Sequence, residues 1–317
     1  MTQRHTRARR LRRFVAVVGV LAVVGGLLGT LAIATDTLGA GGRWESVVAR
    51  VDRFLAGPVP TREAPITVRV TEPPTRTAAP PPTPAPTAVD PGGTPDATAA
   101  PTPSPTPEPV REPVDLDILD DPEAFFASQD HKDWCAVAGT QMVLAIHDRA
   151  DTSVATQREI ASRIREWESY DDSHNGDWGP AAMALALEAY GVPGYEVRAF
   201  ESRQGALRDA ARTIQATRAP VILLAWRGAH TWVMTGFRAD ADPSVFRDAH
   251  IEGTYVLDPW YPRVSSIWGP SDPAGTFQDE DEMVRNFLKW KRPEGAYADR
   301  DGLYITVAPT VALTAAG

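Results

Sequence analysis

The chain of 317 residues has a single cysteine, Cys135, so no disulfide can form within it. A lone thiol is a small buried group, a partner for another chain, or a reactive group. Cysteine and histidine pairs at the spacing of zinc ligands are also missing. The sequence therefore predicts no metal and no cofactor, and it shows no internal repeat.

Aromatic residues are missing from residues 58–113, which hold 18 of the 29 prolines together with many threonines and alanines. Such a segment cannot bury enough apolar surface to offset the entropy lost on ordering. We expect a disordered, extended linker there. The residues after it, 114–317, contain eight of the nine tryptophans and have the usual size of one domain.

Basic residues are scarce in this domain. Residues 114–317 hold 19 lysines and arginines against 32 acidic residues, a net charge of −13. Binding to a phosphate backbone depends largely on lysine and arginine contacts. Nucleic acid is therefore excluded as an expected partner.

Charge is absent from residues 14–35, and residues 1–13 before them carry six arginines. A helix of this length can cross a hydrocarbon core of about 30 Å. The arginines should stay in the cytoplasm, so a transmembrane signal anchor would place the rest of the chain outside it. The alternative is a cleaved signal peptide, since Ala32-Ile33-Ala34 fits a cleavage site; the protein would then be secreted. The length of the apolar run favours the anchor. Residues 36–57 would form a juxtamembrane segment.

Helical patterns come first in the domain and strand patterns follow. The helices are expected at 121–126, 134–148, 152–167, 180–190 and 203–217, and a last one at 279–290. The strands are expected at 220–226, 230–237, 254–257, 263–267 and 303–307. This order predicts an α+β domain in which a helical half packs on an antiparallel sheet. Asp133 is expected to cap the helix that carries Cys135.

Cys135 falls in the first turn of its helix, where the positive end of the helix dipole favours a thiolate. His230 begins a strand and Asp258 ends the next one, so antiparallel pairing would bring these two side chains together. His147 lies on the helix of Cys135, about 18 Å away along the axis, and is too far to serve it. The backbone N–H of Cys135 and the side-chain amide of Gln129 are candidate donors to an oxyanion.

The pattern Gln129-x5-Cys135, followed by His230-Thr-Trp-Val-Met-Thr-Gly and Tyr-Val-Leu-Asp258-Pro, resembles the C39-like peptidases of the papain-like cysteine peptidase group. The resemblance covers most of residues 120–307. It implies a papain-like fold with Cys135 as nucleophile and His230 as general base and acid. It also implies that Asp258 orients the imidazole and that Gln129 contributes to the oxyanion hole.

The sequence departs from that family at three points. Ala136 follows the cysteine where many members have glycine. The interval from His230 to Asp258 is 28 residues, longer than usual, with Ala239–Gly253 as an inserted hairpin or loop. Members fused to bacteriocin exporters face the cytoplasm, whereas this chain is expected to face outward and has no transporter segments. Cleavage of double-glycine leaders is therefore not inferred.

The sequence thus predicts a membrane-anchored, extracytoplasmic cysteine peptidase-like hydrolase that cleaves peptide or amide bonds in a peptide or protein substrate. The alternative is an inactive binding module of the same fold, displayed at the cell surface. Trp134 and Trp232, which flank the cysteine and the histidine, are expected to line the substrate cleft. The loop 171–176 resembles half of a calcium loop, but Ala182 replaces its essential glutamate, so we interpret the loop as a turn.

Overall fold

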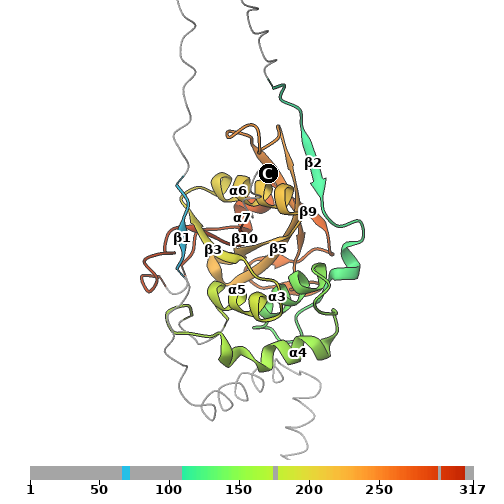
Figure 1. The fold of residues 1–317 in the computed structure, drawn as a ribbon, viewed down its shortest axis with the longest axis vertical. Helices are drawn as coiled ribbons and strands as arrows, with labels where there is room; N and C mark the ends of the chain where they lie inside the picture. The colour runs from blue at the N-terminus through green and yellow to red at the C-terminus, as the bar shows by residue number, and fades with distance from the viewer. Residues whose placement is uncertain (1–65, 72–108, 174–177, 292–293, 311–317) are drawn as a thin grey trace, which may run out of the picture. The chain divides into compact units, whose positions relative to one another are not determined.

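The computed structural model describes residues 66–71, 109–173, 178–291 and 294–310 (Figure 1). The predicted segments 1–13, 14–35 and 36–57 lie outside these residues, as does most of the predicted linker. Among the described residues, no helix has the length and apolar character needed to cross a bilayer.

The described chain folds into helices around one large sheet. The α-helices are α3 (Cys135–Ile146), α4 (Val154–Ser162), α5 (Pro180–Ala189), α6 (Arg203–Thr217) and α7 (Glu280–Asn286). Three short 3-10 turns are η2 (Pro122–Phe125), η3 (Ile164–Glu166) and η4 (Trp226–Gly228). The large sheet contains β1 (Val68–Arg69), β2 (Val114–Asp117), β3 (Tyr195–Phe200), β4 (Val221–Ala225), β5 (His230–Ala239), β6 (Ile251–Leu257), β9 (Thr276–Asp279) and β10 (Tyr304–Pro309). A separate pair is formed by β7 (Val264–Ser265) and β8 (Gly269–Pro270).

The large sheet is mixed. Its order is β1-β3-β10-β4-β5-β6-β9, and β2 pairs with the far end of β5. All of these pairings are antiparallel except the one between β1 and β3, which is parallel. The α+β class is as expected, but β2, β3 and β9 were not predicted, and the strand expected at 263–267 is reduced to the two residues of β7.

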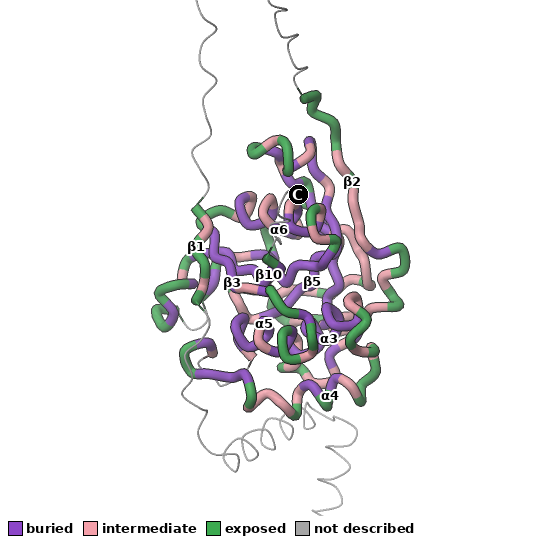
Figure 2. Tube along the Cα trace, viewed as in Figure 1, coloured by how far each residue is buried: buried purple, intermediate pink, exposed green. Residues whose placement is uncertain are grey.

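Helices cover both faces of the sheet, as Figure 1 shows. Successive residues of a strand point to opposite faces. In β4, Val221, Leu223 and Ala225 pack with α6 and α7, whereas Ile222 and Leu224 pack with α3 and α5. Figure 2 shows the resulting buried centre in purple. The expected helical half packed on a sheet is thus present only in part: helices lie on both faces, because a strand that is apolar throughout needs cover on both sides.

Local capping explains where several helices begin and end. The side chain of Ser153 accepts a hydrogen bond from the N–H of Thr156 at the start of α4, and Ser202 caps α6 in the same way. Gly191, with φ of +84°, follows α5 in the left-handed conformation that commonly ends a helix. These ends lie within a few residues of those expected from the sequence.

The part of the predicted linker that the structure describes includes the strand β1. β1 runs beside β3, and the N–H of Val70 donates to the carbonyl of Ala199. Thr67 also donates a hydrogen bond to the carboxylate of Asp299, near the end of the chain. Here the structure differs from an unstructured linker over 58–113, because these few residues satisfy backbone groups at an open sheet edge.

Candidate active site

Cys135 is the first residue of α3. Trp134, rather than the expected Asp133, is the N-cap, and no side chain caps the helix. The first amides of a helix have no acceptor within it. The N–H of Cys135 therefore lies at the positive end of α3, one residue beyond the turn closed by the bond from Trp134 N–H to the carbonyl of His131.

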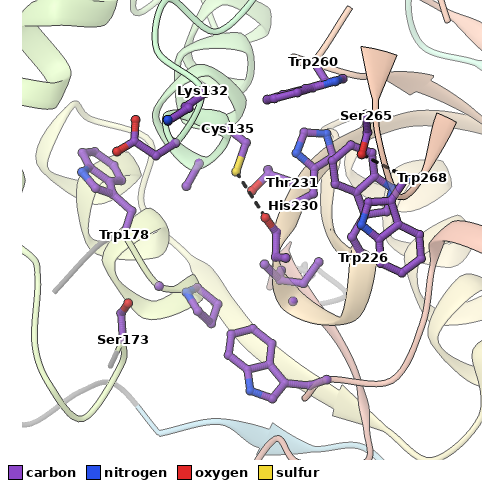
Figure 3. Close-up of a pocket in the computed structure, with 18 of the residues that line it drawn as sticks. Lys132, Cys135, Ser173, Trp178, Trp226, His230, Thr231, Trp260, Ser265 and Trp268 are labelled. Carbon is purple, nitrogen blue, oxygen red and sulfur yellow. Dashed lines mark hydrogen bonds between the residues drawn. The ribbon is translucent and has the colours of Figure 1, made fainter. Parts of the chain in front are cut away.

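Close packing of α3 on β5 sets the position of the cysteine. A Cβ at Gly139 would lie only 2.5 Å from Cγ2 of Thr231, so glycine is what allows this approach. One turn earlier on the helix, the sulfur of Cys135 lies 3.9 Å from the carbonyl oxygen of Ala229, the residue before His230 (Figure 3). The thiol and the start of β5 are thus brought together.

His230 and Asp258 form a buried pair at adjacent strand ends. Nε2 of His230 lies 2.6 Å from Oδ1 of Asp258, and the two residues are 2% and 6% exposed. The same oxygen accepts the N–H of Trp260 at 2.9 Å. Since Nε2 donates to the carboxylate, Nδ1 is the nitrogen left for the thiol of Cys135.

The surroundings of His230 favour its charged form. Burial lowers the pKa of the imidazole, but the charge of Asp258, its hydrogen bond and the contact with Cys135 together outweigh burial. The pKa of His230 is raised from 6.5 to about 9. The imidazole therefore carries a proton at neutral pH.

Three indole rings surround this pair. Trp226 stacks on His230 with ring centroids 4.0 Å apart and planes 19° apart. Trp268, from the β7–β8 pair, stacks on Trp226 at 5.8 Å. Trp260 meets the imidazole edge to face at 6.4 Å. Figure 3 shows Cys135 with Trp178 on one side and this group of rings on the other.

Gln129 is buried close to the turn before α3, and its amide nitrogen is engaged with a backbone carbonyl. Its Nε2 donates to the carbonyl of His131 at 2.8 Å, and its backbone N–H donates to the carbonyl of Pro259. Its Oε1 has no partner among the described residues. The residue is also not one of those that line the pocket at Cys135.

A pocket of about 460 Å³ opens at Cys135. Its tryptophans are Trp178, Trp226, Trp260, Trp268 and Trp290. The expectation for Trp134 and Trp232 is corrected here. The ring of Trp134 packs against His131 with centroids 4.1 Å apart, and Trp232 is only 3% exposed because it points from β5 into the core beside α6.

A buried ion pair in the pocket wall was missed by the sequence analysis. Asp172 and Arg300 are each 1% exposed, and Nη1 of Arg300 lies 2.8 Å from the carboxylate. That carboxylate also accepts the N–H groups of Ala181 and Ala182, so it holds the start of α5. Burial raises the pKa of Asp172, while Arg300 and these hydrogen bonds oppose the rise. The 128 residues between the partners leave no local signal for this pair.

Two other histidines of the described chain have partners outside the candidate site. His147 contacts the hydroxyl of Tyr195 at 3.2 Å, and His250 contacts Glu280 at 3.3 Å. Within the ranges that the structure describes, no group of three or more histidine, cysteine and acidic side chains is arranged to hold a metal ion.

Comparison with known proteins gives two results. A family model described as "Peptidase_C39 like family" matches residues 123–284. One similar solved structure is described as "Crystal structure of a double glycine motif protease from AMS/PCAT transporter in complex with the leader peptide". It is 16% identical and covers 58% of this chain and 91% of its own, with a TM-score of 0.31, too low to support an inference. The curated proteins contain no match.

Proposed function

This chain belongs to the peptidase C39-like family, and we propose that it is a cysteine hydrolase that cleaves peptide or related amide bonds. Membership of this family supports a cysteine peptidase-like function. The finer proposal is that Cys135, His230 and Asp258 act as a triad. The observation that carries it is the meeting of three distant segments: a cysteine at a helix start, a histidine at a strand start and an aspartate at the next strand end.

The proposed reaction has two halves. In the proposed resting state the proton of Cys135 already lies on Nδ1 of His230, and the sulfur attacks as a thiolate on the carbonyl carbon of the scissile bond. His230 then protonates the leaving nitrogen as the carbon–nitrogen bond breaks, which leaves a thioester on the sulfur. A water molecule, deprotonated by the now neutral His230, attacks that thioester, releases the acid and restores the thiolate beside a protonated imidazole. Asp258 holds the ring throughout.

The backbone N–H of Cys135 is the proposed donor to the tetrahedral oxyanion, because it has no acceptor within the helix. Gln129 is the second proposed donor. Its amide nitrogen would have to leave the carbonyl of His131 to serve this role. Gln129 is therefore expected to donate only when substrate is bound, since catalytic hydrogen bonds often tighten at that stage.

The surroundings of the site also enter the proposal. We propose that residues 14–35 anchor the chain in a membrane and that residues 114–317 form an extracytoplasmic domain beyond the linker. Five tryptophans are among the residues that line the pocket, and the acidic Asp172 in its wall is neutralised by Arg300. A peptide with apolar side chains beside the scissile bond would suit these walls. The alternative remains a binding module that retains the fold without turnover.

The test combines digestion of a peptide library with alkylation of the full-length chain by iodoacetamide across pH. Cleavage products should appear with the wild type, disappear in Cys135→Ala and fall by at least about a hundredfold in His230→Ala. His250→Ala is the matched control, since it removes a histidine that contacts Glu280 instead. The Cys135 thiol should react with iodoacetamide well below pH 8, and His230→Ala should remove this reactivity.

Two outcomes would count against the proposal. A thiol that reacts only after unfolding would exclude a nucleophile. A reactive thiol without any cleavage, in a chain that retains peptides from the library, would favour the binding module.

A further inference from the structure

The turn before His230 has an unusual backbone. Trp226, Arg227 and Gly228 have φ angles of +51°, +64° and +84°. A left-handed conformation is unfavourable for every residue that is not glycine, because Cβ then crowds the backbone. Trp226 and Arg227 both carry this cost, so neighbouring structure must hold the turn in place.

The segment that holds it begins at Asn286, the last residue of α7, and continues to Lys291. Nε1 of Trp226 donates to Oδ1 of Asn286 at 3.0 Å, and the N–H of Lys291 donates to the carbonyl of Arg227 at 3.1 Å. The ring of Trp290 covers Gly228 so closely that a Cβ there would lie 2.3 Å from Cε3. Asn286 and Trp290 both lie beyond the residues matched by the family model, which end at 284.

The orientation of the Asn286 amide is fixed by the hydrogen bonds of its nitrogen, Nδ2. Nδ2 donates to the backbone carbonyl and to the carboxylate of Glu282, at 3.2 and 3.0 Å. Oδ1 is therefore the atom presented to the indole N–H of Trp226. A line of contacts thus runs from α7 through Asn286 and Trp226 to the imidazole.

The indole lies flat on that imidazole. The planes of Trp226 and His230 differ by 19° at 4.0 Å, and Trp268 covers the far face of Trp226 with planes 6° apart. A cation over the face of tryptophan is attracted by the electrons of the ring. Two consequences follow for His230: its ring cannot rotate away from Cys135, and its positive charge is stabilised on one face.

We propose that Trp226 is a positioning residue for His230. The indole of Trp226, itself held by Asn286, keeps the imidazole of His230 directed at Cys135 and favours the protonated form of that imidazole. The proposal rests on the proposed function for its consequence in catalysis, but the stacking can be measured without any substrate. Other charged or titratable groups at His230 are Asp258 at the end of β6 and Cys135 on α3. The same pocket also contains Lys132, Asp133 and the neutralised Asp172, and Arg227 lies in the turn.

The experiment is an NMR titration of the full-length chain with labelled histidine, in which His230→Gln identifies the signal. Trp226→Leu should lower the pKa of His230 by about 0.5 to 1.5 pH units, the range expected for loss of a cation–π contact. Trp226→Phe keeps an aromatic face and should lower it by less than half as much. Asn286→Leu removes the acceptor for the indole and should give an intermediate effect.

Trp178→Leu is the matched control. It removes an indole from the same pocket, on the side of Cys135 away from His230, and should leave the pKa of His230 in place. In a peptide assay, Trp226→Leu should lower kcat about tenfold or more with little change in KM. Without the indole, the imidazole of His230 must be reoriented towards Cys135 at each turnover.

An unchanged pKa in Trp226→Leu, or an equal drop in Trp178→Leu, would overturn the proposal. If Trp226→Leu does not fold, Trp226→Phe and Asn286→Leu carry the test alone, and the same pKa in both as in the wild type would overturn it. A lowered pKa in a chain that cleaves no peptide would support the stacking while refuting the proposed hydrolase. The two failures are therefore distinguishable.

Discussion

Replacement of Asp258 by asparagine should change how the stability of the domain depends on pH. The substitution removes the charge that faces His230 but keeps an oxygen that can accept from Nε2 and from the N–H of Trp260. With the charge gone, burial becomes the main influence on the imidazole. Its pKa should then fall from about 9 to below the ordinary 6.5.

The magnitude follows from linkage between proton binding and folding. In the wild type, the pKa of His230 is raised from 6.5 to about 9, which corresponds to about 3 kcal/mol of the free energy of unfolding. This stabilisation is fully present below pH 6.5 and is lost as the pH rises through about 9. In Asp258→Asn the pH dependence of the free energy of unfolding has the opposite sign. A depressed pKa of His230 makes the domain less stable as the pH falls below 6.5.

The assay is urea unfolding of the full-length chain between pH 5 and 10, followed by tryptophan fluorescence. Both proteins should carry Cys135→Ala, so that ionisation of the thiol does not contribute to the difference. Because the contact with Cys135 also raises the pKa of His230, the stabilisation measured in this background should be smaller than in the wild type. His250→Gln provides a control for a histidine that is paired with Glu280 at the surface. Parallel curves of stability against pH for the two proteins would refute the assignment of the raised pKa to Asp258.

Three further substitutions test the framework of the site, each by urea unfolding. Arg300→Met leaves the carboxylate of Asp172 buried without its partner and should cost about 3–5 kcal/mol; a loss below about 1 kcal/mol would contradict the buried pair. Gly228→Ala places a Cβ against Trp290 at positive φ and should cost about 2 kcal/mol or more, so an unchanged midpoint would show that the turn relaxes freely. Asp279→Ala removes the N-cap of α7 and should cost about 1 kcal/mol, and no loss would mean that the cap contributes nothing.

Much of the fold could be predicted where the signal is local. The helix at 203–217 matches α6 because Ser202 caps its start, and His230 and Asp258 meet because consecutive strands pair antiparallel. β3 was missed because Glu196 and Arg198 interrupt its apolar pattern; Arg198 is nevertheless 8% exposed, since acidic partners neutralise it.

The unpredicted parts of the site depend on contacts between distant residues. Trp226 lies over His230 only because its backbone is left-handed, and residue type gives no sign of that conformation. The hydrogen bond that holds this turn comes from Asn286, which lies 60 residues after Trp226 in the sequence. The wall tryptophans were misassigned because closeness in sequence to Cys135 and His230 does not show on which face of a strand or helix a ring lies.

The short strand β1 has a consequence for how the domain would respond to cleavage. A protease that cut the chain between residues 71 and 109 would leave β1 attached to the sheet only by its pairing with β3 and by contacts such as that of Thr67 with Asp299. Two paired residues cannot retain a separate peptide at low concentration. A single cut would therefore release the globular part from everything that precedes it, with a newly exposed sheet edge.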